Sequence, residues 1–248
     1  MQFIRVLAAA FILILFGATS STSETWKIAS LEWPPYSGSK LDRNGTAIDE
    51  LRSALKQLNI ELEVDFMPWT RAKAVASSEE YVGYFPAWPE EVVSGFEPTR
   101  PISLSEVGIV QRAGVDIVWS DLLDLFNSYR IGFVRNYVYP DSIQELIDRH
   151  YGQDQGSENE HDLARTLAAE RIDIALTDPK VLFHVSDELS LSGINPTPII
   201  LHKHPLVLAM NKREGYQRRL RRLNAVVTMK TLTPQMCCLL PEPGKPRL

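Results

Sequence analysis

The stretch TAIDELRSALKQLNIELEVDF, residues 46–66, carries two hydrophobic periods in direct succession. Its first part repeats apolar residues every three or four positions after Thr46 and Asp49, a pair typical of a capping box, which predicts a helix that ends near Asn59. Over residues 60–66 apolar and acidic residues alternate strictly, as in a half-buried strand. A helix followed at once by a strand is a building unit of an α/β fold.

The segment before this stretch supplies a first strand and an aromatic loop. Residues 26–31 alternate as a short strand, and the sequence then reads LEWPPYSG over residues 31–38. Two consecutive prolines fix the backbone and remove two amide donors, so the strand must end there. The stiffened loop therefore places Trp33 and Tyr36 at the end of the first strand.

Strands, loops and helices continue to alternate downstream. We expect a short helix at 70–77 and a third strand at 81–85, followed by Pro-Ala-Trp-Pro at 86–89. The pattern then restarts after an extended segment at 107–115. We expect a helix capped by Ser120, a strand at 131–134 and an aromatic loop at 135–140. Helices capped near Asp141 and Ser157 and a strand at 172–177 follow. Two such units predict an α/β fold with two lobes.

The loops that leave the expected strand ends contain most of the candidate binding residues. In open α/β sheets, ligands bind in the crevice beyond the carboxyl ends of the strands. If both lobes present these ends to one cleft, the cleft has aromatic walls and a few charged groups, which suits a small polar or zwitterionic molecule. The candidates are Trp33, Tyr36, Trp69, Arg71, Phe85, Trp88, Arg135, Asn136, Tyr137 and Asp178.

Residues 1–20 have the pattern of a secretory signal peptide. One positive charge at Arg5 precedes an apolar run at 6–16, and small residues follow. The run is shorter than the roughly 20 apolar residues of a membrane-spanning helix. No cysteine follows it directly, so we expect a periplasmic protein without a lipid anchor.

Composition limits the remaining classes. The 248 residues are 44% hydrophobic and 23% charged with a formal charge of -5, which excludes a disordered chain and makes no case for nucleic-acid binding. The basic run at 218–222 fits the solvated side of a surface helix. The two cysteines, Cys237 and Cys238, are adjacent and indicate neither a zinc nor a redox motif.

The order of several short motifs resembles the bacterial extracytoplasmic solute-binding proteins of the polar amino acid type (family 3), which are associated with ABC importers. The motifs are WPPYSG, residues 45–51, FEPTRPI at 96–102, residues 163–178, and Leu223-Asn224. The resemblance covers about residues 26–229. It implies a two-lobed, periplasmic-binding-protein-like (type II) clamp with two hinge crossings, near 108–115 and 199–205.

The resemblance also implies domain bounds and residue roles. Lobe one would hold residues 24–107 and 206–230, lobe two residues 114–199, and an irregular tail residues 231–248. Trp33 would stack on the ligand, with 85–88 lining the same side. Asp178 would receive an amino group, and the turn at 135–137 would supply donors to a carboxylate.

The chain departs from the family pattern where an arginine usually grips the ligand carboxylate. That position is Val92, so the amino acid assignment weakens, although Arg71, Arg100 and Arg135 are alternative partners. Trp69 and Trp88 are compatible with either core or ligand contacts, and Asp178 with a helix cap. His202 and His204 form a pair without an evident third metal ligand, so we expect no metal and no cofactor.

These features together predict a monomeric, non-enzymatic protein that captures a small polar solute, an amino acid or a similar molecule, and delivers it to an ABC permease. Two alternatives use the same fold. One is a ligand sensor for a membrane receptor, and the other is a small dehydratase-like enzyme in which Glu90 or Asp178 acts as general acid.

Overall fold

The computed structural model describes residues 24–227 except residue 136 and residues 152–155. The expected signal peptide, the C-terminal tail with both cysteines, and the candidate Asn136 lie outside the described residues. No helix in the described part of the chain is both long enough and apolar enough to span a bilayer.

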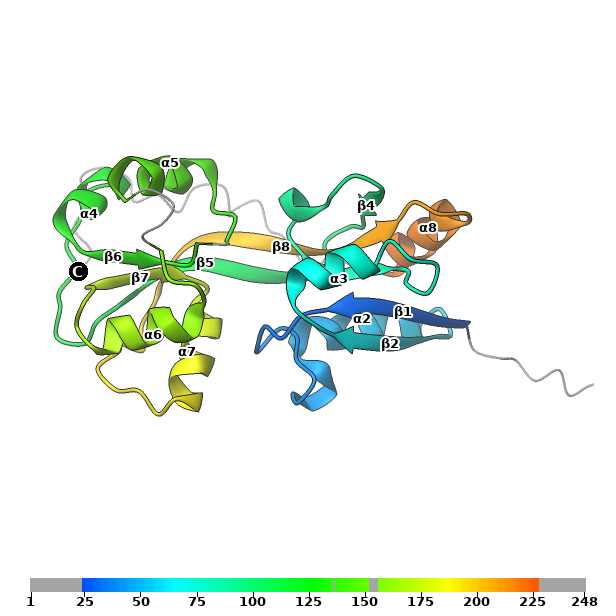
Figure 1. Cartoon of the computed structure of the whole chain (residues 1–248), viewed down its shortest axis with the longest axis horizontal. Helices are drawn as coiled ribbons and strands as arrows, with labels where there is room; N and C mark the ends of the chain where they lie inside the picture. The colour runs from blue at the N-terminus through cyan, green and yellow to red at the C-terminus, as the bar shows by residue number, and fades with distance from the viewer. Residues whose placement is uncertain (1–23, 136, 152–155, 228–248) are drawn as a thin grey trace, which may run out of the picture.

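Lobe one is built around parallel strands with helices packed on them (Figure 1). Strand β1 pairs in parallel with β2 on one side and with β3 on the other. The elements of this lobe are β1 (Glu24–Ser30), η1 (Asp42–Asn44), α2 (Thr46–Lys56), β2 (Ile60–Phe66), α3 (Trp69–Val75), β3 (Gly83–Ala87), η2 (Pro89–Glu91), β4 (Phe96–Pro98) and α8 (Tyr216–Val226).

Lobe two repeats this arrangement with fewer strands. Its parallel pair is β6 and β7, and helices α4 and α5 lie on one side of that pair while α6 and α7 lie on the other (Figure 1). The elements are α4 (Leu122–Ser128), β6 (Ile131–Phe133), α5 (Asp141–His150), α6 (Glu160–Ala168), β7 (Ile174–Thr177) and α7 (Pro179–Glu188).

Two long antiparallel strands connect the lobes. They are β5 (Ser103–Gln111) and β8 (Ile199–Asn211), and together they complete a sheet of order β2-β1-β3-β8-β5-β7-β6, with β4 paired to β8. At its far end β8 pairs with β3 of lobe one, whereas β5 pairs with β7 of lobe two from Gly108 onward. The register of the β5–β8 ladder shifts between Val107 and Gly108. Both lobes are thus joined by paired strands, as the two expected crossings require.

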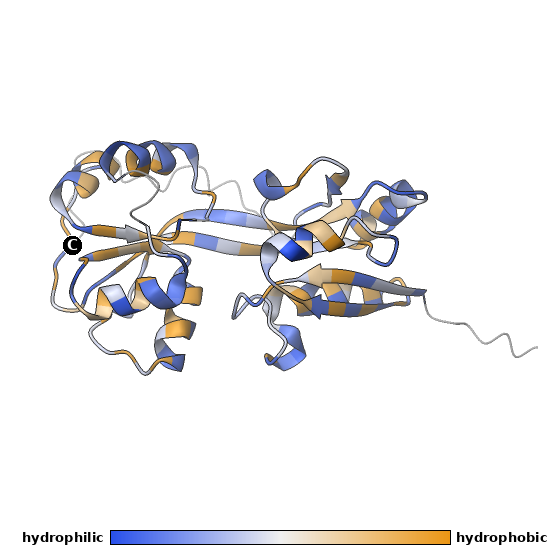
Figure 2. Cartoon of the chain, in the orientation of Figure 1, coloured by the Kyte–Doolittle hydropathy of each residue, from blue (hydrophilic) through white to orange (hydrophobic). Residues whose placement is uncertain are grey.

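Hydrophobic residues occupy much of the strands, and the helices mix hydrophobic with hydrophilic residues (Figure 2). Most of the buried side chains are apolar. One buried cluster belongs to lobe one and includes Tyr84 and Phe96, and another belongs to lobe two and includes Phe126 and Phe133. The third cluster contains residues of both lobes, among them Trp33 and Leu182. The lobes are therefore in contact in this arrangement, and apolar packing is continuous between them.

Helix starts differ in detail from the sequence expectation. The N-cap of α2 is Gly45, and Thr46 is the first helical residue. The Thr46 hydroxyl donates to the Pro35 carbonyl (3.3 Å), so the expected capping box is wrong. The caps of α4 and α6 are Asp121 and Asn159, one and two residues after the expected serines. Both serve through a side-chain oxygen that accepts from a backbone N–H of the first turn.

The start of β7 is tied to the start of β6 by one carboxylate. Asp173 accepts from the backbone N–H (3.1 Å), Nε (2.9 Å) and Nη2 (2.7 Å) of Arg130. This guanidinium lowers the pKa of Asp173 from 3.8 to about 2. A carboxylate with a lowered pKa in the folded state stabilises the fold fully above its unfolded value and loses that contribution as pH falls through its folded value.

We expect Asp173→Asn to lower the free energy of unfolding by about 1 kcal/mol at pH 7, a modest value because Arg130 is largely exposed. The difference in free energy of unfolding between the variant and the parent should shrink as pH is lowered from roughly 5 to 2. Urea unfolding at a series of pH values measures this difference. Asp162→Asn is the matched control, because its pair with Arg165 is exposed and loose (3.5 Å), and a pH-independent deficit for Asp173→Asn would contradict the expectation.

Candidate functional site

Loops from the carboxyl ends of five strands converge where the lobes meet. In lobe one, residues 31–37 follow β1, residues 67–69 follow β2, and Trp88 follows β3. In lobe two, Val134, Arg135 and Tyr137 follow β6 and Asp178 follows β7. Because these strands are parallel within each lobe, their carboxyl ends lie at one edge, the usual position of a ligand crevice.

A cavity of about 190 Å³ lies between these loops. A cavity of this size suits a small molecule. It is lined from both lobes, by Leu31, Glu32, Trp33, Trp69, Pro86, Trp88, Glu91 and Leu206 of lobe one and β8, and by Val134, Tyr137, Glu158, Asn159 and Glu160 of lobe two.

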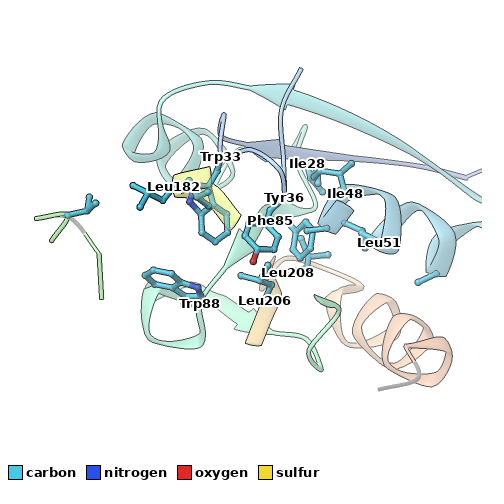
Figure 3. Packing of buried hydrophobic residues seen from close by; sticks show 14 of the residues in the cluster. Ile28, Trp33, Tyr36, Ile48, Leu51, Phe85, Trp88, Leu182, Leu206 and Leu208 are labelled. Carbon is cyan, nitrogen blue, oxygen red and sulfur yellow. The ribbon is translucent and has the colours of Figure 1, made fainter. Parts of the chain in front are cut away.

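Three aromatic rings form a connected group at the cavity. Trp88 meets Trp33 at a centroid distance of 6.0 Å and Tyr137 at 5.1 Å, with interplanar angles of 84° and 87°. Figure 3 shows the indoles of Trp33 and Trp88 at one end of the apolar cluster, with Phe85 deeper and α2 residues at the other end. The core behind Trp33 and Trp88 therefore holds these two rings in place. The third ring, Tyr137, comes from lobe two.

A hydrogen-bond chain crosses between the lobes at the same place. Trp33 Nε1 donates to Tyr137 Oη (2.9 Å), and the Tyr137 hydroxyl donates to a carboxylate oxygen of Glu160. Burial, reinforced by the negative charge of Glu160, raises the pKa of Tyr137 well above its usual value. Tyr137 therefore stays protonated and keeps its donor role over the physiological pH range.

Asp178 is fully buried and accepts four hydrogen bonds. Its Oδ1 receives the backbone N–H groups of Lys180 (2.9 Å) and Val181 (3.4 Å), and its Oδ2 receives the Tyr36 hydroxyl (2.8 Å) and the Glu106 N–H (2.8 Å). Burial raises the pKa of Asp178, and these donors oppose the rise. The residue thus caps α7 and ties it to the Trp33 loop, with both oxygens occupied by donors of the chain.

Two further carboxylates organise the lobe-one side. Glu91 accepts from Trp69 Nε1 (2.8 Å) and from the Trp88 backbone N–H (3.1 Å). Glu90 lies 2.9 Å from Nε2 of buried His204, whose ring stacks on Trp88 at 4.7 Å and 4°. His204 Nδ1 is buried without a hydrogen-bond partner in the described structure. Glu91 therefore holds Trp69 and Trp88, two of the three tryptophans that line the cavity, while His204 supports Trp88 from β8.

The structure sorts nine of the ten sequence candidates into three groups, and the tenth, Asn136, lies outside the described residues. Trp33, Trp69, Trp88 and Tyr137 line the cavity together. The other described candidates do not line it: Tyr36, Phe85 and Asp178 are buried, and Arg71 and Arg135 are exposed. Arg135 bonds Glu158 (3.0 Å), and the Arg71 side chain forms no hydrogen bond or ion pair with another described residue. Their roles toward a ligand stay predictions.

Sequence reasoning missed the acidic part of the lining. Glu32, Glu91, Glu158 and Glu160 were not among the candidates, and neither was Asn159 between the last two. The available signal was position: Glu32 precedes Trp33 in the first strand-end loop, and Glu160 lies at an expected helix start. Glutamate is so common on surfaces that neither position distinguishes it from a solvated residue.

No group of three or more histidine, cysteine, aspartate or glutamate side chains suited to a metal occurs in the part of the chain that the structure describes. The His202 and His204 rings lie edge to face at 5.4 Å. Burial lowers the pKa of His202. This pair remains without a third ligand among the described residues.

The arrangement of the elements identifies the fold class. The chain has a mixed α/β, two-lobed fold of the periplasmic-binding-protein type, which confirms the expected fold class. No family model matches the sequence, and no curated protein sequence matches it either.

Solved structures match over most of the chain. A histidine kinase sensor domain with similarity to periplasmic binding proteins has a TM-score of 0.62 at 19% identity, covering 82% of this chain and 88% of that one. An ancestral arginine-binding protein bound to arginine has 0.59 at 17%, covering 82% and 90%. The GluR0 ligand-binding core with L-glutamate has 0.63 at 13%, covering 83% and 91%. Identities this low show a shared fold.

Proposed function

We propose that this protein is an extracytoplasmic solute-binding protein that encloses one small polar molecule between its lobes. The observation that carries the proposal is the cavity lined from both lobes, with an aromatic contact and hydrogen bonds that pass from one lobe to the other beside it. A site assembled from two lobes exists only when they meet, so ligand contacts stabilise the closed arrangement over any open one.

The similar structures support binding as the common use of this fold. Their descriptions name arginine, glutamine and L-glutamate as bound ligands. One neighbour is described as an ancestral amino acid-binding protein and a precursor of cyclohexadienyl dehydratase, so turnover has to be tested as well as binding. In this chain Asp178 accepts four internal hydrogen bonds, which argues against its use as a general acid.

The membrane partner follows from the proposed location outside the cytoplasm. Closure joins surfaces of both lobes into one face, which a permease of an ABC importer would recognise, and we propose delivery to such a permease by a monomer. A receptor is the second candidate, favoured by the similarity to a histidine kinase sensor domain. Deletion of the gene would abolish ligand uptake in the first case and only a transcriptional or chemotactic response in the second.

We expect the purified mature chain to show a rise in melting temperature with at least one compound from a panel of amino acids, amines, organic acids and aromatic metabolites. A ligand at 100 times its dissociation constant stabilises a binder by about 2.7 kcal/mol, which a thermal shift detects easily. Mass spectrometry of the incubated ligand separates binding from turnover. Recovery of a chemically altered ligand would contradict the proposal, and a Trp33→Ala variant that still responds fully would place the ligand elsewhere.

A further inference from the structure

The cavity walls carry negative charge and no positive charge among the described residues. None of the lining residues is lysine, arginine or histidine, and four are glutamates, two from each lobe: Glu32 and Glu91, and Glu158 and Glu160. A site lined by one sign of charge favours solutes of the opposite sign.

Most of this charge is uncompensated by the chain itself. Glu91 accepts only from the Trp69 indole and a backbone N–H, and Glu160 accepts from the Tyr137 hydroxyl. Glu32 accepts from one backbone N–H. Only Glu158, which is 74% exposed, forms an ion pair, with Arg135. Three of the four carboxylates therefore have neutral donors alone within the part of the chain described.

The aromatic lining adds a second, independent preference. Trp33, Trp88 and Tyr137 line the same cavity, and Trp88 stands at nearly a right angle to the other two. Aromatic rings at such angles can surround a cation, which is attracted to the negative charge of the ring faces, and tryptophan gives the strongest such contact. Lys73 Nζ already lies 5.5 Å from the Trp69 ring. His204 stacks on Trp88 and Tyr36 packs against Trp33, so a ligand would contact only the parts of these two rings that face the cavity.

The residues considered as partners for a ligand carboxylate are engaged elsewhere. Val92, at the position where the family resemblance implies an arginine, packs against the apolar cluster with Tyr84 and Phe96 and does not line the cavity. Arg100 bonds Asn224 on α8. At the α6 start, Asn159 Oδ1 accepts from the Asp162 N–H, and the first helical residue, Glu160, adds a negative charge to the first turn. An entering carboxylate would thus meet like charge.

We propose that the cavity binds a small organic cation, an amine or quaternary ammonium compound, and that binding needs no carboxylate on the ligand. This inference rests on the proposed solute-binding function and names its ligand class. The glutamates supply the charge complement and the perpendicular rings supply the cation–π contacts.

Three ligand pairs test the charge rule by calorimetric titration of the purified chain. Agmatine and L-arginine differ by the α-carboxylate. Choline and 3,3-dimethyl-1-butanol differ by the positive charge at nearly constant shape, and putrescine is set against L-glutamate. We expect at least one cation to bind at least about tenfold more tightly than the compound it is paired with. The affinity for that cation should fall as the salt concentration rises.

Charge-neutralising variants locate the effect. The double variant Glu91→Gln/Glu160→Gln should reduce cation affinity at least about tenfold, whereas Glu145→Gln/Asp148→Asn, an equal charge change at two exposed residues of α5 outside the lining, should leave it unchanged. If the double variant does not fold, Glu158→Gln at the exposed rim should still give a smaller loss in the same direction.

Two results would overturn the cation rule. Tighter binding of L-glutamate or L-arginine than of every carboxylate-free cation would refute it and leave the solute-binding function standing. Absence of binding by all six compounds would refute it as well, and the broader thermal-shift panel then decides separately whether the protein binds any solute.

Discussion

Trp88→Ala is expected to lower the free energy of unfolding by about 3–5 kcal/mol, the range for deleting a buried tryptophan. Trp88 is 4% exposed and stacks on His204, contacts Trp33 and Tyr137 at its edges, and donates from Nε1 to Ser105 Oγ (2.9 Å). Its removal leaves a void between β3, β8 and both lobes. Urea unfolding measures the loss.

Trp69→Ala is the matched control for this variant. Trp69 is only half-buried and has a single ring contact, with Tyr84 at 5.4 Å, so we expect a loss about half as large. Equal losses for the two tryptophans would mean that Trp88 is not the packing centre described above.

The second large effect is expected for Asp178→Ala, at about 2–3 kcal/mol. The variant removes the α7 cap, worth about 1 kcal/mol, and leaves the buried Tyr36 hydroxyl without its acceptor, at about 1–3 kcal/mol. Burial raises the pKa of Asp178, so the loss of a costly buried charge offsets part of the damage.

Asp121→Ala separates the cap from the buried network. Asp121 is exposed and caps α4 by accepting one hydrogen bond from the Asp124 N–H (2.9 Å). Asp121→Ala should therefore lower the free energy of unfolding by only about 1 kcal/mol. If Asp178→Ala costs no more than this control, Asp178 acts only as a helix cap and the link to Tyr36 adds nothing.

Local pattern was enough for the first lobe. The strict alternation at 60–66 and the apolar face at 46–56 appear as β2 and α2, because each buries one side on the neighbouring layer. β1 ends at Ser30, close to the expected end of the first strand, and the two prolines lie in the loop that follows it. Four aromatic candidates also line one cavity, because parallel strands bring their carboxyl ends to one edge.

Long-range features were not predictable in the same way. The sequence of β8 includes His202, Lys203, His204 and Pro205, which interrupt any strand pattern, yet pairing with β5 holds it extended over 13 residues. The acidic lining depends on bringing Glu32 and Glu91 opposite Glu158 and Glu160. No short-range period encodes that meeting, since it depends on how the lobes pack.

The β5–β8 connection also determines how the lobes can move. Because both connections are extended strands hydrogen-bonded to each other, the lobes are joined by an elastic two-stranded ribbon instead of two loose linkers. Such ribbons accept more twist than wide sheets, and an irregular ladder bends most easily where its register shifts. Opening should therefore be a twist and bend centred near Val107 and Gly108, with a restoring force that returns the lobes to one relative orientation.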